Sequence, residues 1–287
     1  MCLGCNYDDS HDDKNADSAT RRNFLASALG LTAASALGSV ADAAISVWDI
    51  EARGLTIDND GVLLPAYTAS PMGMVNRTTV VILNDSPGIP KDVQELARDV
   101  ARTGFVSLVV DCAMRGTAKI STHPDALLSE AFTREVQSDV RAGIVTLNGS
   151  GPYANPVVIL GIGAGGYTAL RMALADPLGV VGVVALYTPI EFPEKSNTDP
   201  RPDLITMLAR LNVPVQFHAG TDDPTITREH LNWLSRFAAV EPDRREFYLY
   251  SGAGHGFYQP SAPKYDKGYQ MLAKKRWQQF LVKRFGQ

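Results

Sequence analysis

Short apolar runs alternate with longer stretches of helical spacing along most of this chain. Seven runs are strand-like, because they are mostly rich in β-branched residues and are bounded by Gly, Pro, Asn or Asp: Val62–Tyr67, Thr79–Leu83, Val106–Val110, Val157–Leu160, Val180–Leu186, Val213–Phe217 and Glu246–Tyr250. Six stretches have the spacing of helices: Lys91–Arg102, Ser129–Leu147, Tyr167–Ala175, Asp203–Leu211, Arg228–Ala239 and Lys264–Phe285. Strand followed by helix, repeated, predicts an α/β fold with a mainly parallel, doubly wound sheet and helices on both faces.

Prolines refine this prediction at two places. Pro65 has no backbone N–H, so we expect the first strand to lie at an edge of the sheet. The Pro-rich segment Thr188–Pro202 is predicted to form a loop at the carboxyl edge, where it is a candidate lid over a ligand. Residues 44–287 contain no internal repeat or low-complexity linker, and we expect them to form a single domain.

The first 43 residues differ in kind from the rest of the chain. Arg21 and Arg22 precede an uncharged run rich in Ala, Leu and Gly, Ala26–Val40, and a small-x-small sequence ends at Ala43. This order resembles a twin-arginine signal peptide cleaved after Ala43. About fifteen apolar residues are too few to span a bilayer, which takes roughly 20. We therefore expect recognition by the twin-arginine export machinery, a periplasmic or secreted protein, and no stable membrane insertion.

Composition and charge narrow the classes of partner. Of the 287 residues, 45% are hydrophobic and 20% are charged, which is typical of a soluble globular protein. The formal net charge of −4 leaves no basic excess to neutralise phosphates, so nucleic acid is not an expected partner. Cys2 and Cys5 resemble half of a zinc site, but the sequence has no second pair to complete four ligands. We expect a small-molecule substrate or ligand, and neither metal nor cofactor.

The glycine-rich stretch Val157–Tyr167 links a buried strand to a helix and fits two motifs. Gly161, Gly163 and Gly166 satisfy the dinucleotide fingerprint G-x-G-x-x-G. That fingerprint normally opens the first βαβ unit and has an acidic partner about 20 residues later, and neither condition is met here. The same stretch fits a nucleophile elbow, G-x-nucleophile-x-G, with Gly163 at its centre and Gly165 as the second flanking glycine.

Two polar loops follow the glycine turn in a characteristic order. The first, Ala219–Pro224, follows a predicted strand and contains Asp222 and Asp223. The second, Ser251–Phe257, follows the next strand and contains His255. Elbow, acid and histidine appear in this order in the α/β-hydrolase fold, so the elbow interpretation is favoured.

Several segments together resemble the dienelactone hydrolase family. They are Gly161–Gly166, Gly220–Asp223, Gly254–Phe257, Asn84–Ile89, Arg102–Phe105 and Val110–Arg115, while Pro263–Asp266 is similar to exported members. The likeness covers about residues 60–285. It implies an α/β-hydrolase fold and the hydrolysis of a small ester or lactone.

The resemblance implies a role for each matched residue. His255 would be the general base, oriented by Asp223, and the backbone N–H of Ala164 would line the oxyanion hole. Arg115 would receive the substrate carboxylate. Asp85 stands where the family has a glutamate that helps to activate a thiol.

Three positions qualify these assignments. Asp222 competes with Asp223, although the family spacing Gly220-x-x-Asp223 favours the latter. Gln259 stands where the family has a second basic contact. Gly163 replaces the cysteine or serine nucleophile, and without a side chain it offers no acyl-enzyme route.

No other nucleophile stands out, and three functions stay open. Cys112, Ser86 and Ser251 are candidates on loops, but none lies on an elbow. The first function is a weak hydrolase or other general-base enzyme, with water or substrate in the space vacated at Gly163. The second is a non-catalytic binding protein for a small carboxylate or lactone. The third is a dinucleotide-binding protein.

Overall fold

The computed structural model describes residues 47–73, 76–114, 130–148, 155–175, 179–190 and 204–286. They belong to one compact unit, Ile45–Gln287. The expected signal peptide, Arg115 and most of the expected lid lie outside the described residues. No helix in the described part of the chain is long and apolar enough to cross a membrane.

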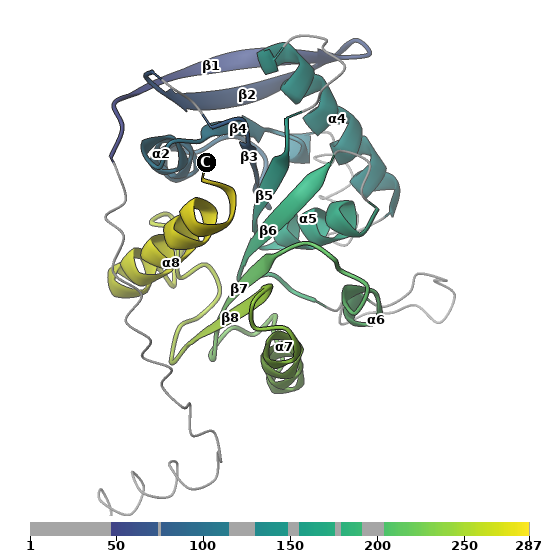
Figure 1. Ribbon diagram of the computed structural model, residues 1–287, viewed down its shortest axis with the longest axis vertical. Helices are drawn as coiled ribbons and strands as arrows, with labels where there is room; N and C mark the ends of the chain where they lie inside the picture. Colours follow the sequence, from purple (N-terminus) through teal and green to yellow (C-terminus); the bar gives the residue numbers. More distant parts are fainter. Residues whose placement is uncertain are drawn as a thin grey trace, which may run out of the picture. The chain divides into compact units, whose positions relative to one another are not determined.

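An eight-stranded sheet forms the centre of this unit, in the order β1-β2-β4-β3-β5-β6-β7-β8 (Figure 1). Strands β3 to β8 are parallel, whereas β1 and β2 are antiparallel to each other and β2 is antiparallel to β4. The mainly parallel sheet is as the sequence predicts. The strands are β1 (Ile50–Asn59), β2 (Val62–Pro71), β3 (Thr79–Leu83), β4 (Val106–Val110), β5 (Val157–Ile162), β6 (Val180–Leu186), β7 (Val215–Gly220) and β8 (Arg245–Tyr250).

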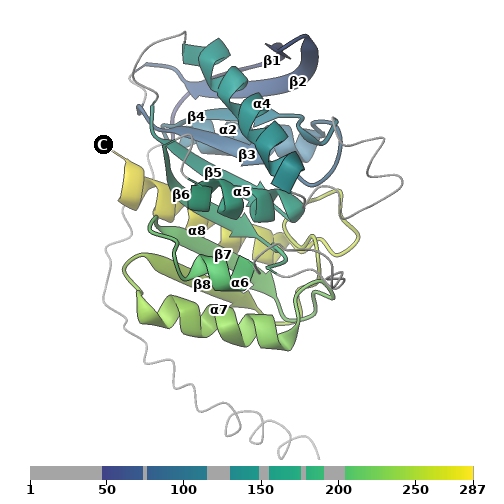
Figure 2. The same ribbon diagram turned by 90° about the vertical axis from the view of Figure 1, so that its right-hand side faces the viewer.

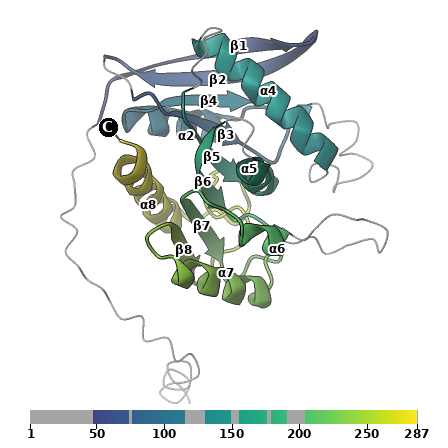
Figure 3. The ribbon, with the colours of Figure 1, turned by 45° about the vertical axis from the view of Figure 1, so that its right-hand side comes forward.

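Helices cover both faces of the sheet, which confirms the doubly wound prediction (Figures 1 and 2). Helices α2 (Lys91–Arg102) and α8 (Lys267–Phe285) pack on one face. The other face carries α4 (Glu130–Asn148), α5 (Ala164–Ala175), α6 (Leu204–Leu208) and α7 (Arg228–Val240). Figure 3 shows α8 and α5 on opposite sides of the central strands.

The strands are buried on both faces because their side chains alternate between two hydrophobic cores. On β3, Val80 and Ile82 join the core beneath α2 and α8, whereas Val81 and Leu83 join the core beneath α4 and α5. This double burial explains why the sequence shows continuous apolar runs rather than alternation.

The sequence pattern missed β1. Most of its residues are exposed, so it carries no apolar run. It pairs with β2 through a tight turn at Asp60 and Gly61, whose φ angles are +52° and +82°. Two central residues with positive φ are typical of the hairpin turn for which Asp-Gly is a signal.

The expectation that Pro65 marks an edge strand was wrong. β2 lies between β1 and β4, and β1 is the edge. The carbonyl of Pro65 accepts a hydrogen bond from the N–H of Asp111, just beyond the last pair of the β2–β4 ladder. The N–H and C=O of a strand residue point to the same side. The N–H that Pro65 lacks would therefore also have pointed toward β4, at a position where the β2–β4 ladder has already ended.

Candidate active site

The candidate site lies where the parallel strands end, at the carboxyl edge of the sheet. In open α/β sheets this edge is where ligands bind, because the loops there converge. Five loops contribute: those after β3, β5, β6, β7 and β8, carrying Asp85, Gly163, Tyr187, Asp223 and His255.

His255 contacts the carboxylate of Asp223. Its Nδ1 lies 2.9 Å from Oδ2 and 3.2 Å from Oδ1 of Asp223. The Asp223 side chain is fully buried, while that of His255 is 36% exposed. The backbone N–H and hydroxyl of Thr225 both donate to Asp223 Oδ1, at 2.8 and 2.7 Å. A carboxylate held by two hydrogen bonds in this way fixes the histidine ring, and leaves Nε2 for a reacting proton.

Asp222, the competing acid, lies apart from this pair. It is exposed, and its Oδ1 accepts a hydrogen bond from the hydroxyl of the neighbouring Thr221 at 2.9 Å. The structure therefore brings Asp223 to His255.

The pKa of His255 is raised above its ordinary value. The hydrogen bond to Asp223 is the main cause; burial opposes it, and the negative charges of Asp223 and Asp85 add to it. The ring thus binds a proton more strongly than a free histidine, which suits a general base.

Gly163 forms a sharp turn between β5 and α5. Its φ of +54° lies in the left-handed region, its N–H donates to the carbonyl of Leu186 at 2.9 Å, and its carbonyl accepts from Gly166 at 3.0 Å. A residue with positive φ between a strand and a helix is the geometry of a nucleophile elbow, and glycine takes this φ without strain.

The other glycines of this turn pack against protein atoms. A Cβ on Gly161 would collide with the backbone of Gly166, and a Cβ on Gly166 would collide with the side chain of Thr188. A Cβ on Gly165 would collide with the carbonyl of Leu83. Close packing within the protein accounts for these glycines, so they lend no support to a dinucleotide site.

The space beside Gly163 holds the Asp85 side chain. A Cβ on Gly163 would lie 3.0 Å from Cγ and 3.3 Å from Cβ of Asp85, and closer still to Oδ2. The Ser86 hydroxyl donates to the other oxygen, Oδ1, at 3.0 Å. The expectation of a vacated space at Gly163 was therefore wrong, because a carboxylate from the loop after β3 extends into it.

Ala164 is the first residue of α5, three positions before the predicted start of that helix. Backbone N–H groups in the first turn have no acceptor within the helix, and the helix dipole adds positive potential there. The N–H of Ala164 is thus suited to stabilise an oxyanion formed beside Gly163.

Comparison with protein families shows which family this chain belongs to. The model of the dienelactone hydrolase family matches residues 64–285. The chain belongs to the dienelactone hydrolase family. A Bradyrhizobium protein named "Probable 2-oxo-3-(5-oxofuran-2-ylidene)propanoate lactonase" is 26% identical over 231 residues, 79% of this chain and 90% of that protein.

Solved structures share the fold of this dienelactone hydrolase family member. A Klebsiella pneumoniae protein described as a "putative dienelactone hydrolase" has a TM-score of 0.64 at 21% identity, over 82% of this chain and 98% of that one. A dienelactone hydrolase-like promiscuous phosphotriesterase from metagenomic libraries has a TM-score of 0.63 at 19% identity, over 83% and 99%.

Tyr187 is a site residue that the sequence analysis missed in this dienelactone hydrolase family member. Its φ is +38°, its ring is fully buried, and it stands edge-on to His255 with ring centroids 5.1 Å apart. Its hydroxyl donates to Oε1 of Gln259 at 2.6 Å. A non-glycine residue with positive φ marks a position where the surroundings impose strain, often at a functional site. No sequence pattern signals such a residue.

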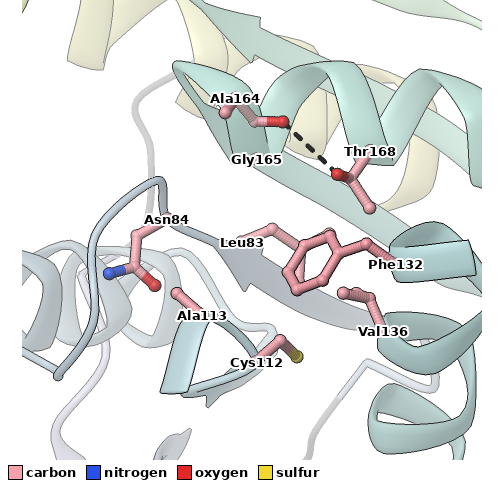
Figure 4. Close-up of a pocket in the computed structure, with 9 residues that line it drawn as sticks. All are labelled: Leu83, Asn84, Cys112, Ala113, Phe132, Val136, Ala164, Gly165 and Thr168. Carbon is pink, nitrogen blue, oxygen red and sulfur yellow. Dashed lines mark hydrogen bonds between the residues drawn. The ribbon is translucent and has the colours of Figure 1, made fainter. Parts of the chain in front are cut away.

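The three alternative nucleophiles differ in their exposure to solvent. Ser86 and Ser251 are exposed, and Ser86 donates to Asp85. Cys112 is 5% exposed and lines a cavity of about 20 Å³ next to Ala164, enough for one water (Figure 4).

No group of three or more possible metal ligands occurs among the residues that the structure describes.

Proposed function

We propose that this chain is an exported hydrolase of small carboxylic esters or lactones that activates water directly, without an acyl-enzyme. The observation that carries the proposal is the 2.9 Å contact between His255 and Asp223 beside an elbow whose central residue is Gly163. A general base without an elbow nucleophile can take its proton from water instead.

The proposed reaction uses His255, a water molecule and the backbone N–H of Ala164. His255 Nε2 takes a proton from water while the water oxygen bonds to the substrate carbonyl carbon. The N–H of Ala164 stabilises the negative oxygen that forms. When the C–O bond breaks, His255 returns its proton to the leaving oxygen. General-base catalysis of this kind typically contributes about 10²- to 10⁴-fold.

The names of the relatives support a substrate class for this proposal. Besides the Bradyrhizobium lactonase, a Methylorubrum extorquens protein named as a carboxymethylenebutenolidase is 26% identical over 261 residues, 86% of this chain and 87% of that protein. We therefore place unsaturated lactones bearing a carboxylate first. Arg115 is the proposed contact for that carboxylate.

The test is a panel of chromogenic esters and enol lactones, assayed with the mature wild type and with His255→Ala. We expect measurable turnover that falls at least about 100-fold in the variant. Asp222→Asn is the control, because it removes a nearby charge that does not touch His255. Wild-type turnover that survives in His255→Ala contradicts the proposal and indicates a contaminating esterase.

Other outcomes identify the alternatives. If the panel shows no turnover but a small carboxylate or lactone raises the melting temperature, the chain is a binding protein. If NAD or a flavin raises the melting temperature, the dinucleotide interpretation is restored.

Export is tested separately. Replacing Arg21 and Arg22 together by Lys is expected to leave uncleaved precursor in the cytoplasm, because the receptor reads the arginine pair as an address. Export of this variant at the wild-type level contradicts the proposed twin-arginine route. Cell fractionation and the mass of the N-terminal peptide give the result.

A further inference from the structure

We infer that Asp85 is a catalytic residue of this site, and that its carboxylate holds the hydrolytic water at the elbow in place of the missing nucleophile. The inference rests on the proposed function. It assigns Asp85 a role that does not depend on a thiol.

The position of the Asp85 carboxylate is the first argument. Its Oδ2 overlaps the position that the Cβ of a side chain on Gly163 would take. Its Oδ1 is engaged by the hydroxyl of Ser86 at 3.0 Å, so Oδ2 is the oxygen directed at the elbow. A nucleophile on the elbow would be excluded by this carboxylate, whereas a water beside it would be held by a charge-assisted hydrogen bond.

The second argument is the electrostatic interaction between Asp85 and His255. The negative charge of Asp85 contributes to the raised pKa of His255, so the two groups are within electrostatic reach. Nδ1 of His255 is engaged by Asp223, which leaves Nε2 as its free acceptor. A water between them donates one hydrogen to Nε2 and the other to Oδ2 of Asp85. Its lone pair is then directed away from both, toward a substrate carbonyl.

Chemistry favours holding water over direct attack by Asp85. Attack on an ester would form an intermediate from which either the carboxylate or the alkoxide leaves. A carboxylic acid is a far stronger acid than an alcohol, so the carboxylate leaves far more readily than the alkoxide. The intermediate therefore returns to the ester. With water as the attacking group, its oxygen bonds to the acyl carbon, the C–O bond of the ester breaks, and His255 carries the proton to the leaving oxygen.

The experiment compares the wild type with Asp85→Ala and Asp85→Asn on the best substrate of the panel. We expect Asp85→Ala to lower kcat about 10- to 100-fold with little change in KM, a typical scale for part of a general-base system. Added formate is expected to restore several-fold of the lost kcat, because it supplies a carboxylate to the emptied space. Asp85→Asn is expected to move the acidic limb of the rate profile to lower pH, since it removes a negative charge near His255. Asp222→Asn is the matched control and is expected to show neither effect.

A single turnover in ¹⁸O-water separates the two roles of Asp85. We expect the label in the product acid from the first turnover, and no added mass on the peptide that contains Asp85. An acyl adduct on that peptide, or unlabelled product in the first turnover, overturns the inference in favour of a nucleophilic Asp85.

The failure of the inference is distinct from the failure of the proposed function. Wild-type kcat and an unchanged pH profile in Asp85→Ala, with His255→Ala inactive, overturn the inference alone. A wild type that is inactive on the whole panel overturns both. Loss of kcat in Asp85→Ala without any formate rescue and without a pH shift in Asp85→Asn indicates a structural role, and also overturns it.

Discussion

The hydroxyl of Tyr187 donates a 2.6 Å hydrogen bond to Oε1 of Gln259, 72 positions further along the chain. This bond joins the loop after β6 to the loop after β8, and the Tyr187 ring on the first loop packs against the His255 ring on the second. Gln259, the residue at the family's second basic position, thereby helps to hold the ring that packs against His255.

Replacing Tyr187 by Phe is expected to lower the free energy of unfolding by about 1 kcal/mol, since it removes one hydrogen bond and leaves the Gln259 amide oxygen without its donor. The ring remains beside His255, so kcat is expected to change less than threefold. Urea unfolding gives the first value. Tyr265→Phe, which removes a less buried Tyr–Gln bond of 2.8 Å to Gln270, is the control and is expected to cost less.

The pH dependence of turnover follows from the raised pKa of His255. As the proposed general base, His255 acts with its ring neutral, so kcat/KM is expected to rise with pH through a value above the ordinary 6.5. Asp223→Asn removes the hydrogen-bonded charge that raises this pKa, and the rise is expected at lower pH with a lower maximum rate. A profile centred at or below 6.5 in the wild type would contradict the assignment of His255 as the base.

Gly163→Ser tests the elbow itself. The new Cβ meets the Asp85 carboxylate and takes a positive φ, so we expect a loss of about 1 kcal/mol in stability and no burst of product. Combining it with Asp85→Ala removes the collision, and the double variant is expected to show a burst with activated esters. Stopped-flow assay and the mass of the acylated protein give the answer. A folded double variant without a burst means that the surrounding site does not support an acyl-enzyme.

His218 predicts how stability depends on acid. It is fully buried, Nδ1 lies 2.7 Å from the Tyr250 hydroxyl and Nε2 lies 2.8 Å from Oε1 of Gln216. Burial, with a smaller contribution from Arg276, lowers its pKa from 6.5 to about 3. Below pH 6.5 the unfolded chain binds a proton that the folded protein does not, so stability falls by up to about 1.4 kcal/mol per pH unit from this group.

Urea unfolding at pH 7 and pH 5 measures this dependence. Replacing His218 by Asn is expected to lower stability at pH 7 and to flatten the slope between the two pH values. An unchanged slope would mean that His218 is not the group responsible. The control is Asp243→Asn, because Asp243 is exposed and its substitution leaves the buried network intact.

The sequence by itself determined the order of the elements from β2 onward and the resemblance to the family. Apolar runs such as Thr79–Leu83 form strands in which burial on both faces requires continuous apolar side chains. This requirement is visible in the local sequence. The loops with Asp223 and His255 were identifiable because their order along the chain follows that of the fold. β1 was missed because its residues are mostly exposed, and its pairing depends on β2.

Tertiary structure alone decided what stands at the elbow. Asp85 and Gly163 are 78 positions apart in number, and only the pairing of β3 with β5 brings the ends of their strands together. The sequence showed that Gly163 lacks a side chain, but not that another residue's carboxylate reaches the same point. The strain at Tyr187 is likewise invisible in sequence, because a positive φ in a non-glycine residue is imposed by its neighbours in space.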